Sequence, residues 1–122
     1  MDLIQREKCA KFDAKFVSCD PKLKVGISQN VRNGLRPING LRISPEGDTC
    51  GWYIWAGEEW SDAPDFFVPL HAKHLEQWAP LVLPYLGLPP GWRFLVTEEC
   101  EDAWKDPQLK LSASNGNSMG PG

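Results

Sequence analysis

The sequence lacks several patterns that would assign it to a known class of site. Its four cysteines include no Cys-x-x-Cys pair, and no histidine stands close enough to complete a zinc knuckle. No phosphate-binding glycine loop ending in Gly-Lys-Ser/Thr occurs. No run of eighteen apolar residues is present, and charged residues occupy the start, where a secretory signal needs an apolar stretch. We therefore expect no structural zinc, no nucleotide site and no membrane span, and a cytoplasmic protein with reduced thiols.

Tyrosine and methionine are scarce, whereas glycine and proline are abundant. The 122 residues hold two Tyr and two Met, but eleven Gly, eleven Pro and six Trp. This many glycines and prolines indicates short elements joined by turns and argues against a long helical bundle. With 42% hydrophobic residues, the chain is large enough for one domain that buries roughly two thirds of its unfolded surface. The predicted class is α+β, a single domain with an antiparallel or mixed sheet and a kinked helical segment packed on it.

Positive charge is scarce after position 45. Residues 1–45 carry nine Lys/Arg against four Asp/Glu, a net +5, whereas residues 46–122 carry four against twelve, a net −8. The basic part has no clustered arginines interleaved with aromatic residues, so we expect no nucleic acid partner. The acidic part favours a basic protein partner, or simply keeps the domain soluble.

The chain divides into three predicted parts. Residues 1–13 form an N-terminal arm or short helix, residues 14–111 form the α+β domain, and residues 112–122 form a disordered tail. The tail is predicted because its Ser, Asn, Gly and Pro residues offer almost no apolar surface to offset the entropy of ordering.

Short strands and turns are predicted in the first half of the domain. We expect a short strand at 15–19, a strand or the start of a helix at 23–27, and a short strand at 41–43. Asn33-Gly34 and Asn39-Gly40 are typical of turns.

Two segments forty positions apart resemble each other. Residues 51–59 and 91–99 each begin with Gly-Trp, continue as an apolar strand and end in two glutamates. The first strand is apolar on both faces, which is typical of a central strand, and a short final strand is expected around Ala103. Two copies are too few for a repeat fold, so the similarity indicates two strands of one sheet. If both run in the same direction, the four glutamates emerge where strands meet loops, where binding groups concentrate.

A helix is predicted near 70–78 from apolar residues at helical spacing. Pro80 lacks an amide donor and collides with the preceding turn, so we expect a kink there or a fresh start at Pro80 or Pro84. Gly87 and the Pro-Pro-Gly sequence that follows it end the helical segment.

Tryptophans stand beside acidic residues at the ends of the two similar segments. An Arg or Lys of a partner can lie over such an indole while its charge meets the carboxylates. The alternative is that the tryptophans belong to the core and the acidic residues are merely solvated. The predicted acidic/aromatic surface consists of Glu58, Glu59, Trp60, Asp62, Glu98, Glu99, Glu101, Asp102 and Trp104.

A small hydrolase is an alternative from another class. Cys50 precedes a turn and could pair with His71 or His74, but no third residue that would orient the histidine is visible. Two of the carboxylates could instead act as general acid and base. The two histidines lie three positions apart, yet no third metal ligand stands at a recognisable spacing. We predict no catalytic residue, no metal and no cofactor.

Four segments occur in a specific order. They are residues 50–59 (Cys-Gly-Trp-Tyr-Ile-Trp-Ala-Gly-Glu-Glu), 65–71 (Asp-Phe-Phe-Val-Pro-Leu-His), 83–94 with Pro-Pro-Gly-Trp, and 101–104 (Glu-Asp-Ala-Trp). Together they resemble a bacterial immunity-protein family of polymorphic toxin systems, formerly described only as a domain of unknown function. The resemblance implies a small α+β protein that protects its producer by binding a cognate toxin. It implies no particular toxin-contacting residues.

The predicted function combines this resemblance with the residue pattern. We expect a non-enzymatic immunity protein that neutralises a toxin by occlusion, through the acidic/aromatic surface and against a basic surface of the toxin. A general protein-interaction module that has no toxin partner is the other alternative. The oligomeric state stays open.

Overall fold

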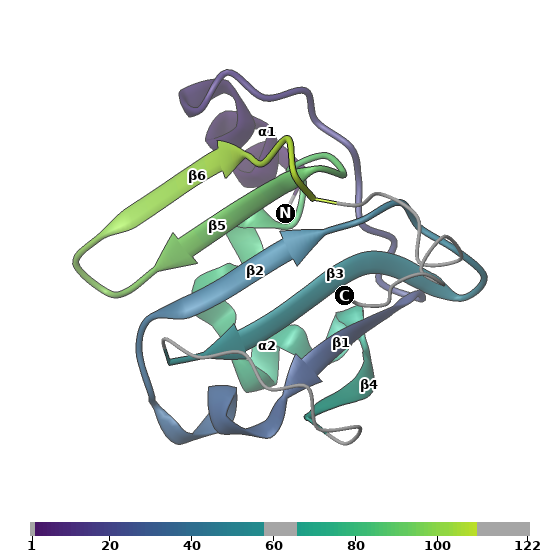
Figure 1. The fold of residues 1–122 in the computed structure, drawn as a ribbon, viewed down its shortest axis with the longest axis vertical. Coiled ribbons are helices and arrows are strands. Elements are labelled where there is room, and N and C mark those ends of the chain that lie inside the picture. The colour runs from purple at the N-terminus through teal and green to yellow at the C-terminus, as the bar shows by residue number, and fades with distance from the viewer. Residues whose placement is uncertain (1, 58–65, 110–122) are drawn as a thin grey trace.

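A computed structural model describes residues 2–57 and 66–109, which form a mixed sheet with short helices on one side (Figure 1). The strands are β1 (Lys24–Ser28), β2 (Ile38–Arg42), β3 (Thr49–Ala56), β4 (Phe67–His71), β5 (Trp92–Val96) and β6 (Glu101–Lys105). The helices are α1 (Asp2–Lys11), η1 (Gln29–Asn33), η2 (Ala72–His74), α2 (Leu75–Trp78) and η3 (Pro80–Tyr85), where η marks a 3-10 helix. The strand order is β4-β1-β3-β2-β5-β6, and only β1 and β3 pair in parallel. The predicted α+β class is confirmed.

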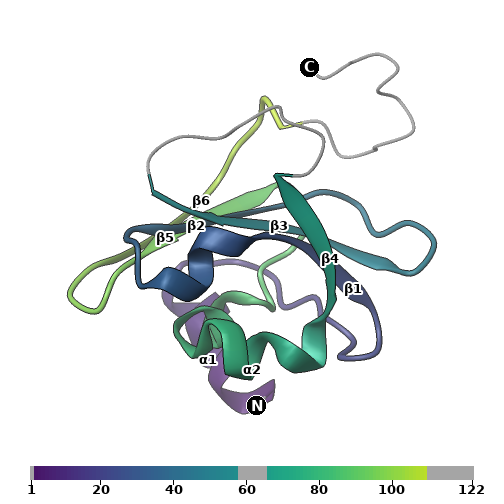
Figure 2. The same ribbon diagram turned by 90° about the horizontal axis from the view of Figure 1, so that it is seen from below.

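The core lies between the helices and one face of the sheet. Figure 2 shows α1, α2 and the segment that follows α2 on the same side. Trp52 and Phe94 are buried there with ring centres 5.3 Å apart, and the ring of Tyr85 stacks on Phe94 at 5.2 Å. Trp92 is only half-buried and packs against this core. We call this the helical face and the opposite side of the sheet the open face.

The two similar segments become β3 and β5, which pair with opposite edges of β2. Gly40 of β2 faces Ile54 on one side and Phe94 on the other, two residues that are forty positions apart. Both strands are antiparallel to β2, so they run in the same direction and their C-terminal ends lie on the same side of the sheet (Figure 1). The interpretation of the similarity as two strands of one sheet is confirmed.

The glycines of the two Gly-Trp pairs, one inside β3 and one directly before β5, adopt the same unusual conformation. Gly51 has φ +95° and Gly91 has φ +96°, values that side chains other than glycine rarely tolerate. A Cβ on Gly51 would lie 1.9 Å from the carbonyl oxygen of Ile43. Gly51 therefore allows a close approach of the main chain at the end of β2, where the Gly91 N–H also donates to the Arg42 carbonyl at 2.7 Å.

The strand predicted at 15–19 is wrong. This stretch has no strand pairing, although the Val17 N–H donates to the Gly87 carbonyl at 2.8 Å. The carbonyls of Val17 and Ser18 accept hydrogen bonds from the guanidinium of Arg42 instead. The Arg42 side chain, which comes from β2, therefore occupies main-chain carbonyls that would otherwise be available to a neighbouring strand.

The turn predicted at Asn39-Gly40 is also wrong, whereas the one at Asn33-Gly34 is confirmed. Gly40 lies inside β2, where the ring of Phe94 covers it. The position requires glycine because a Cβ there would lie 2.2 Å from the ring. Gly34 ends η1 with φ +79°. Both sites need glycine, but only one needs it for the conformation of the main chain.

The helical segment starts later than predicted but breaks where expected. Leu70 pairs with Val25 of β1, so it belongs to β4, and the first helical turn begins at Ala72. The main chain leaves the helical conformation at Ala79 and resumes with Pro80 as an early residue of η3. The predicted kink is therefore confirmed.

Candidate functional site

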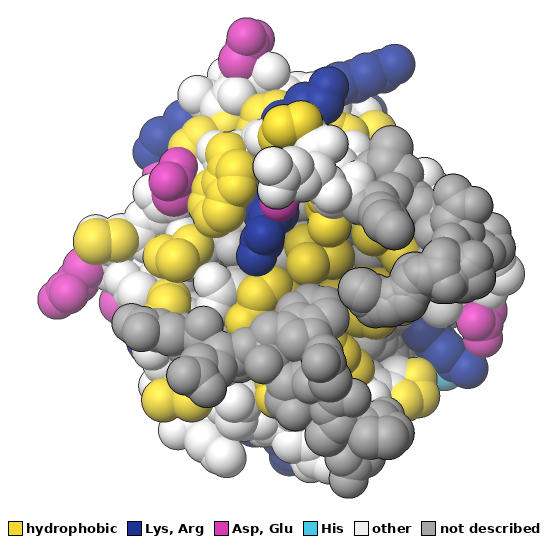
Figure 3. Space-filling model, viewed as in Figure 1, with side chains coloured by type: hydrophobic (Ala, Val, Ile, Leu, Met, Phe, Trp, Pro, Cys, Tyr) yellow, Lys and Arg dark blue, Asp and Glu magenta, His cyan; other side chains and the backbone are white. Residues whose placement is uncertain are grey.

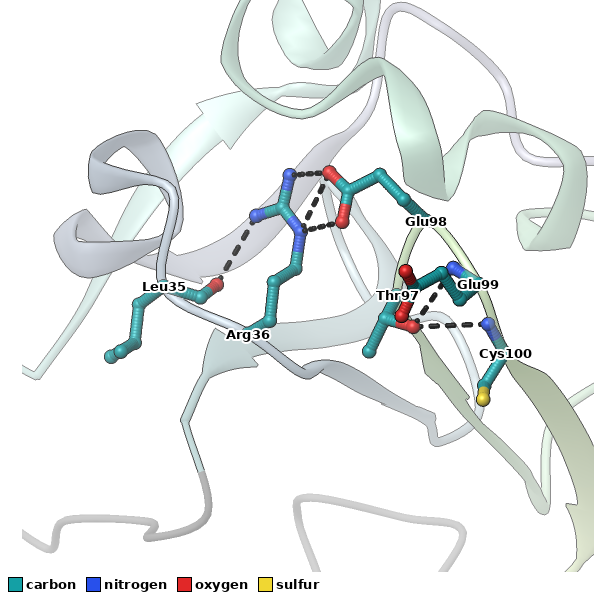
Figure 4. Close-up of polar contacts among 6 residues, drawn as sticks. All are labelled: Leu35, Arg36, Thr97, Glu98, Glu99 and Cys100. Atoms are coloured by element: carbon teal, nitrogen blue, oxygen red, sulfur yellow. Dashed lines mark hydrogen bonds and ion pairs between the residues drawn. The ribbon is translucent and has the colours of Figure 1, made fainter.

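The turn between β5 and β6 carries two of the predicted acidic residues, and we call Thr97–Cys100 the acidic turn (Figure 4). The Thr97 hydroxyl accepts the N–H groups of Glu99 at 3.1 Å and Cys100 at 3.0 Å, and the Thr97 N–H donates to the Cys100 carbonyl at 2.8 Å. These bonds satisfy the turn internally, so the glutamate side chains are free to extend outward.

Glu98 extends toward Arg36, which lies just before β2. The Arg36 Nε donates to both carboxylate oxygens at 3.1 Å, and Nη2 donates to Oε2 at 2.6 Å (Figure 4). These hydrogen bonds hold the pKa of Glu98 below its usual range. The pair is exposed to water, so it adds little to stability, and a cation of a partner could compete for the same carboxylate. Glu99 is exposed and makes no ion pair with any residue in the described ranges.

Glu101 serves a different purpose, because its side chain lies on the helical face. Lys8 of α1 donates to its carboxylate at 2.7 Å, and Lys11 and the Tyr85 hydroxyl bond it as well. The hydrogen bond from Lys11, followed by those from Lys8 and Tyr85, lowers the pKa of Glu101 to about 2. Burial, and then the bond to Glu101, raise the pKa of Tyr85. This carboxylate therefore fastens α1 to β6, and two lysines offset its charge.

Trp104 lies on the open face, where a cation of this chain already contacts it. The guanidinium carbon of Arg93 lies 5.9 Å from the ring centres of both Trp104 and Trp55. Its Nη1 donates to Asp106 at 3.2 Å. Trp104 is still 37% exposed, and Asp102 is exposed beside it on the same strand. The structure thus separates Trp104 and Asp102 from Glu101, which belongs to the opposite face.

The open face is largely apolar. Figure 3, which looks onto this face, shows hydrophobic side chains gathered over the sheet with a basic side chain among them. The alternation of side chains along the strands assigns to it Leu41, Tyr53, Trp55, Phe67, Arg93, Leu95 and Trp104. An indole partly exposed beside an arginine is typical of binding surfaces.

Two shallow hollows adjoin the acidic turn. One, of about 280 Å³, lies between the turn and η3 and is lined by Tyr85, Glu99 and Glu101, among others. The second, of about 470 Å³, is lined by Arg32 and Trp78 and shares Leu81 and Glu98 with the first. The acidic turn therefore stands at the border of a continuous hollowed surface.

The arrangement required for a hydrolase is not present in the described part of the chain. Cys50 is fully buried and its thiol contacts Cys19, and it makes no hydrogen bond to a histidine there. A general acid needs a raised pKa, whereas the pKa values of Glu98 and Glu101 are lowered. The rings of His71 and His74 lie 6.3 Å apart, and no three potential metal ligands cluster within 2–57 and 66–109.

The remaining predicted residues, Glu58, Glu59, Trp60 and Asp62, lie outside the described residues, as do residues 112–122. The positions of these four residues, and the division of the chain into arm, domain and tail, stay predictions.

Sequence reasoning missed the cations that contact the predicted residues, which are Arg36, Arg93, Lys8 and Lys11. Arg93 could have been assigned to the open face from its alternation with Trp92 and Phe94. The contact of Lys8 and Lys11 with Glu101 had no sequence signal, because about ninety positions separate these residues.

Comparison with known proteins places the chain in a family. No described helix is both long and apolar enough to cross a membrane. The comparisons with curated proteins and with solved structures gave no significant match. The Imm33-like domain, by contrast, matches residues 4–106, which include every described strand and all but the first two residues of α1. An immunity protein has a toxin as its partner. The chain belongs to the Imm33-like family of immunity proteins.

Proposed function

We propose that this protein neutralises a cognate toxin in the cytoplasm of the bacterium that makes it, by covering a basic surface of the toxin and catalysing no reaction itself. The observation that carries the proposal is the alignment of β3 and β5 on β2. Because β3 and β5 end on the same side of the sheet, the acidic turn lies on the side where β3 ends, and Glu58 and Glu59 follow β3 in the sequence. A concentration of negative charge there would attract a positively charged protein and speed association.

The contact surface that we propose runs from the acidic turn onto the open face. Glu98 and Glu99 would supply charge, and Trp104 would supply an anchor that is already held beside Arg93. Asp102 lies between them on β6. Glu58, Glu59, Trp60 and Asp62 complete the surface in this proposal. Glu101 does not face the toxin in this proposal, because Lys8 and Lys11 already bind its carboxylate on the helical face. It supports the contact surface by holding α1 against β6.

The two outer strands, β4 and β6, disfavour pairing with a strand of a partner. We therefore propose that the contact uses side chains. Pro69 stands in the middle of β4 and has no N–H to offer. On β6 the Asp102 carboxylate accepts the Ala103 N–H at 2.8 Å. These are devices that limit pairing at a sheet edge.

The test is a charge reversal at the acidic turn. A chain with both Glu98→Lys and Glu99→Lys should bind the cognate toxin more weakly, and its affinity should depend less on ionic strength. The matched control reverses two exposed acidic residues on helices, Glu7→Lys and Glu76→Lys. Equal loss of affinity in both variants would point to net charge, and no loss in the first would remove the acidic turn from the contact surface. Failure of the unaltered protein to protect cells that express the toxin would overturn the proposed function itself.

A further inference from the structure

A buried arginine lies at the centre of a group of cysteines. Arg42 is 1% exposed, and its guanidinium donates only to main-chain carbonyls. The acceptors are Cys50 at 3.0 Å, Val17 at 2.8 Å, Ser18 at 2.9 Å, Leu88 at 2.9 Å and Leu86 at 3.3 Å. No carboxylate of the described residues pairs with it. A buried cation without a counter-ion is costly, so a nearby group that can become negative is favoured.

Two thiols from distant parts of the chain meet beside this guanidinium. Arg42 Nε bonds the carbonyl of Cys50, and Nη2, on the same edge of the guanidinium, bonds the carbonyl of Ser18, the residue before Cys19. The side chains of Cys19 and Cys50 are in hydrogen-bond contact with each other. The third nearby thiol, Cys9, is buried, and its burial raises its pKa.

The contact makes the two thiols chemically unequal. The Cys19 S–H donates to the Cys50 sulfur, and this contact lowers the pKa of Cys50 in spite of burial, with smaller contributions from the main chain of Trp52 and from Arg42. The same contact raises the pKa of Cys19. A thiolate is the reactive form of cysteine, so Cys50 is the better prepared of the two sulfurs to close a disulfide.

A groove gives small molecules access to one member of the pair. It encloses about 330 Å³ and is lined by Cys19 together with Gln5, Pro21, Lys73 and Leu86, among others. Cys19 is half-buried, whereas Cys50 is completely covered. An oxidant as small as a hydroperoxide fits this groove, and the reaction can pass inward from Cys19 to Cys50.

We propose that Cys19 and Cys50 form a redox-reactive pair that hydrogen peroxide converts into a reversible disulfide. The Cys19 sulfur attacks a peroxide oxygen, the O–O bond breaks, and the departing hydroxide takes the Cys19 thiol proton, so that a sulfenic acid and one water form. The Cys50 sulfur then attacks the Cys19 sulfur, the S–O bond breaks, and a second water leaves. Two thiols and one peroxide thus give one disulfide and two waters. This site is independent of toxin binding and covalently joins the 14–20 segment to β3.

The experiment uses the full chain carrying Cys100→Ser, which removes the exposed thiol. The reduced protein is treated with hydrogen peroxide, quenched, and analysed by intact mass and by peptide mapping without reductant. We expect a loss of about 2 Da, a cross-linked pair of peptides that contain Cys19 and Cys50, and recovery of the original mass on adding a thiol reductant.

Three further variants decide the assignment. Adding Cys9→Ser should leave the loss of mass unchanged, whereas adding either Cys19→Ser or Cys50→Ser should abolish it. Cys19→Ser suffices on its own if the variant at the buried Cys50 does not fold. The proposal is overturned if the loss persists without Cys19, if Cys9 appears in the cross-link, or if peroxide leaves the folded protein with all three thiols reduced.

Discussion

The two faces of the β5–β6 hairpin use the same kinds of residue in opposite ways. On the helical face, Glu101 is bound by two lysines and a tyrosine, and Phe94 packs between Trp52 and Tyr85. On the open face and in the acidic turn, Trp104 remains 37% exposed, and the exposed Glu98 contacts a single half-buried arginine. Acidic residues three positions apart in sequence therefore differ in what they can offer a partner. Proximity in sequence does not make them one site.

The largest expected difference between the faces is in packing. Phe94→Ala should lower the free energy of unfolding by about 3–5 kcal/mol, because it leaves a cavity between the sheet and the helices. Leu95→Ala, one position along and on the open face, should cost below about 1.5 kcal/mol because its side chain is only partly covered. Urea denaturation of the two variants measures the contrast, and equal losses would contradict the division into a packed face and an open one.

Two arginines sharpen the same contrast. Arg42→Met should cost about 3 kcal/mol, since five carbonyls, three of them in buried hydrogen bonds, lose their donor. Arg36→Met removes an ion pair to a fully exposed carboxylate and should leave the free energy of unfolding almost unchanged. A stability scan that found Arg42→Met harmless would mean that the buried guanidinium does not organise the 14–20 segment.

Acid sensitivity should distinguish Glu101 from Glu98. The folded pKa of Glu101, about 2, lies below its unfolded value of about 4.3, so its contribution is present above the unfolded pKa and is lost as pH falls toward 2. Allowing for solvent screening, we expect this contribution to be about 1–2 kcal/mol. Glu101→Gln should remove that part of the acid-induced loss, whereas Glu98→Gln should leave most of it. Denaturant titrations at pH 6 and pH 3 make the comparison, and identical pH profiles for the wild type and Glu101→Gln would refute the assignment of Glu101 to the fold.

The smallest stability change is expected on the open face. Trp104→Ala should change the free energy of unfolding by less than about 1 kcal/mol, because the indole is partly exposed and lies beside Arg93. If the proposed contact surface is correct, the same substitution should weaken toxin binding by about 2 kcal/mol, as the loss of an interface anchor does. Calorimetric titration with the toxin alongside thermal melts separates the two effects. A large drop in melting temperature without a binding defect would mean that Trp104 belongs to the core.

Local patterns in the sequence predicted the elements that depend on short-range rules. The forty-residue similarity predicted two aligned strands, because each copy carries its own alternation and its own starting glycine. Pro80 predicted the break in the helical segment, since the cost of an internal proline is local. Gly40 misled the prediction, because a glycine demanded by a neighbouring ring looks the same in sequence as one demanded by a turn.

The sequence by itself determined the α+β class, the central position of β3, and a run of acidic residues at strand ends. The motifs that indicated an immunity protein are also legible without coordinates, and the match over residues 4–106 confirms the family. Only the tertiary structure decided which charges are neutralised, because Lys8 and Lys11 reach Glu101 through the packing of α1 on the sheet. It also decided that Arg42 takes the carbonyls of residues 17 and 18 and that Arg93 covers Trp104. Such contacts depend on how distant elements meet in space, and no local spacing encodes them.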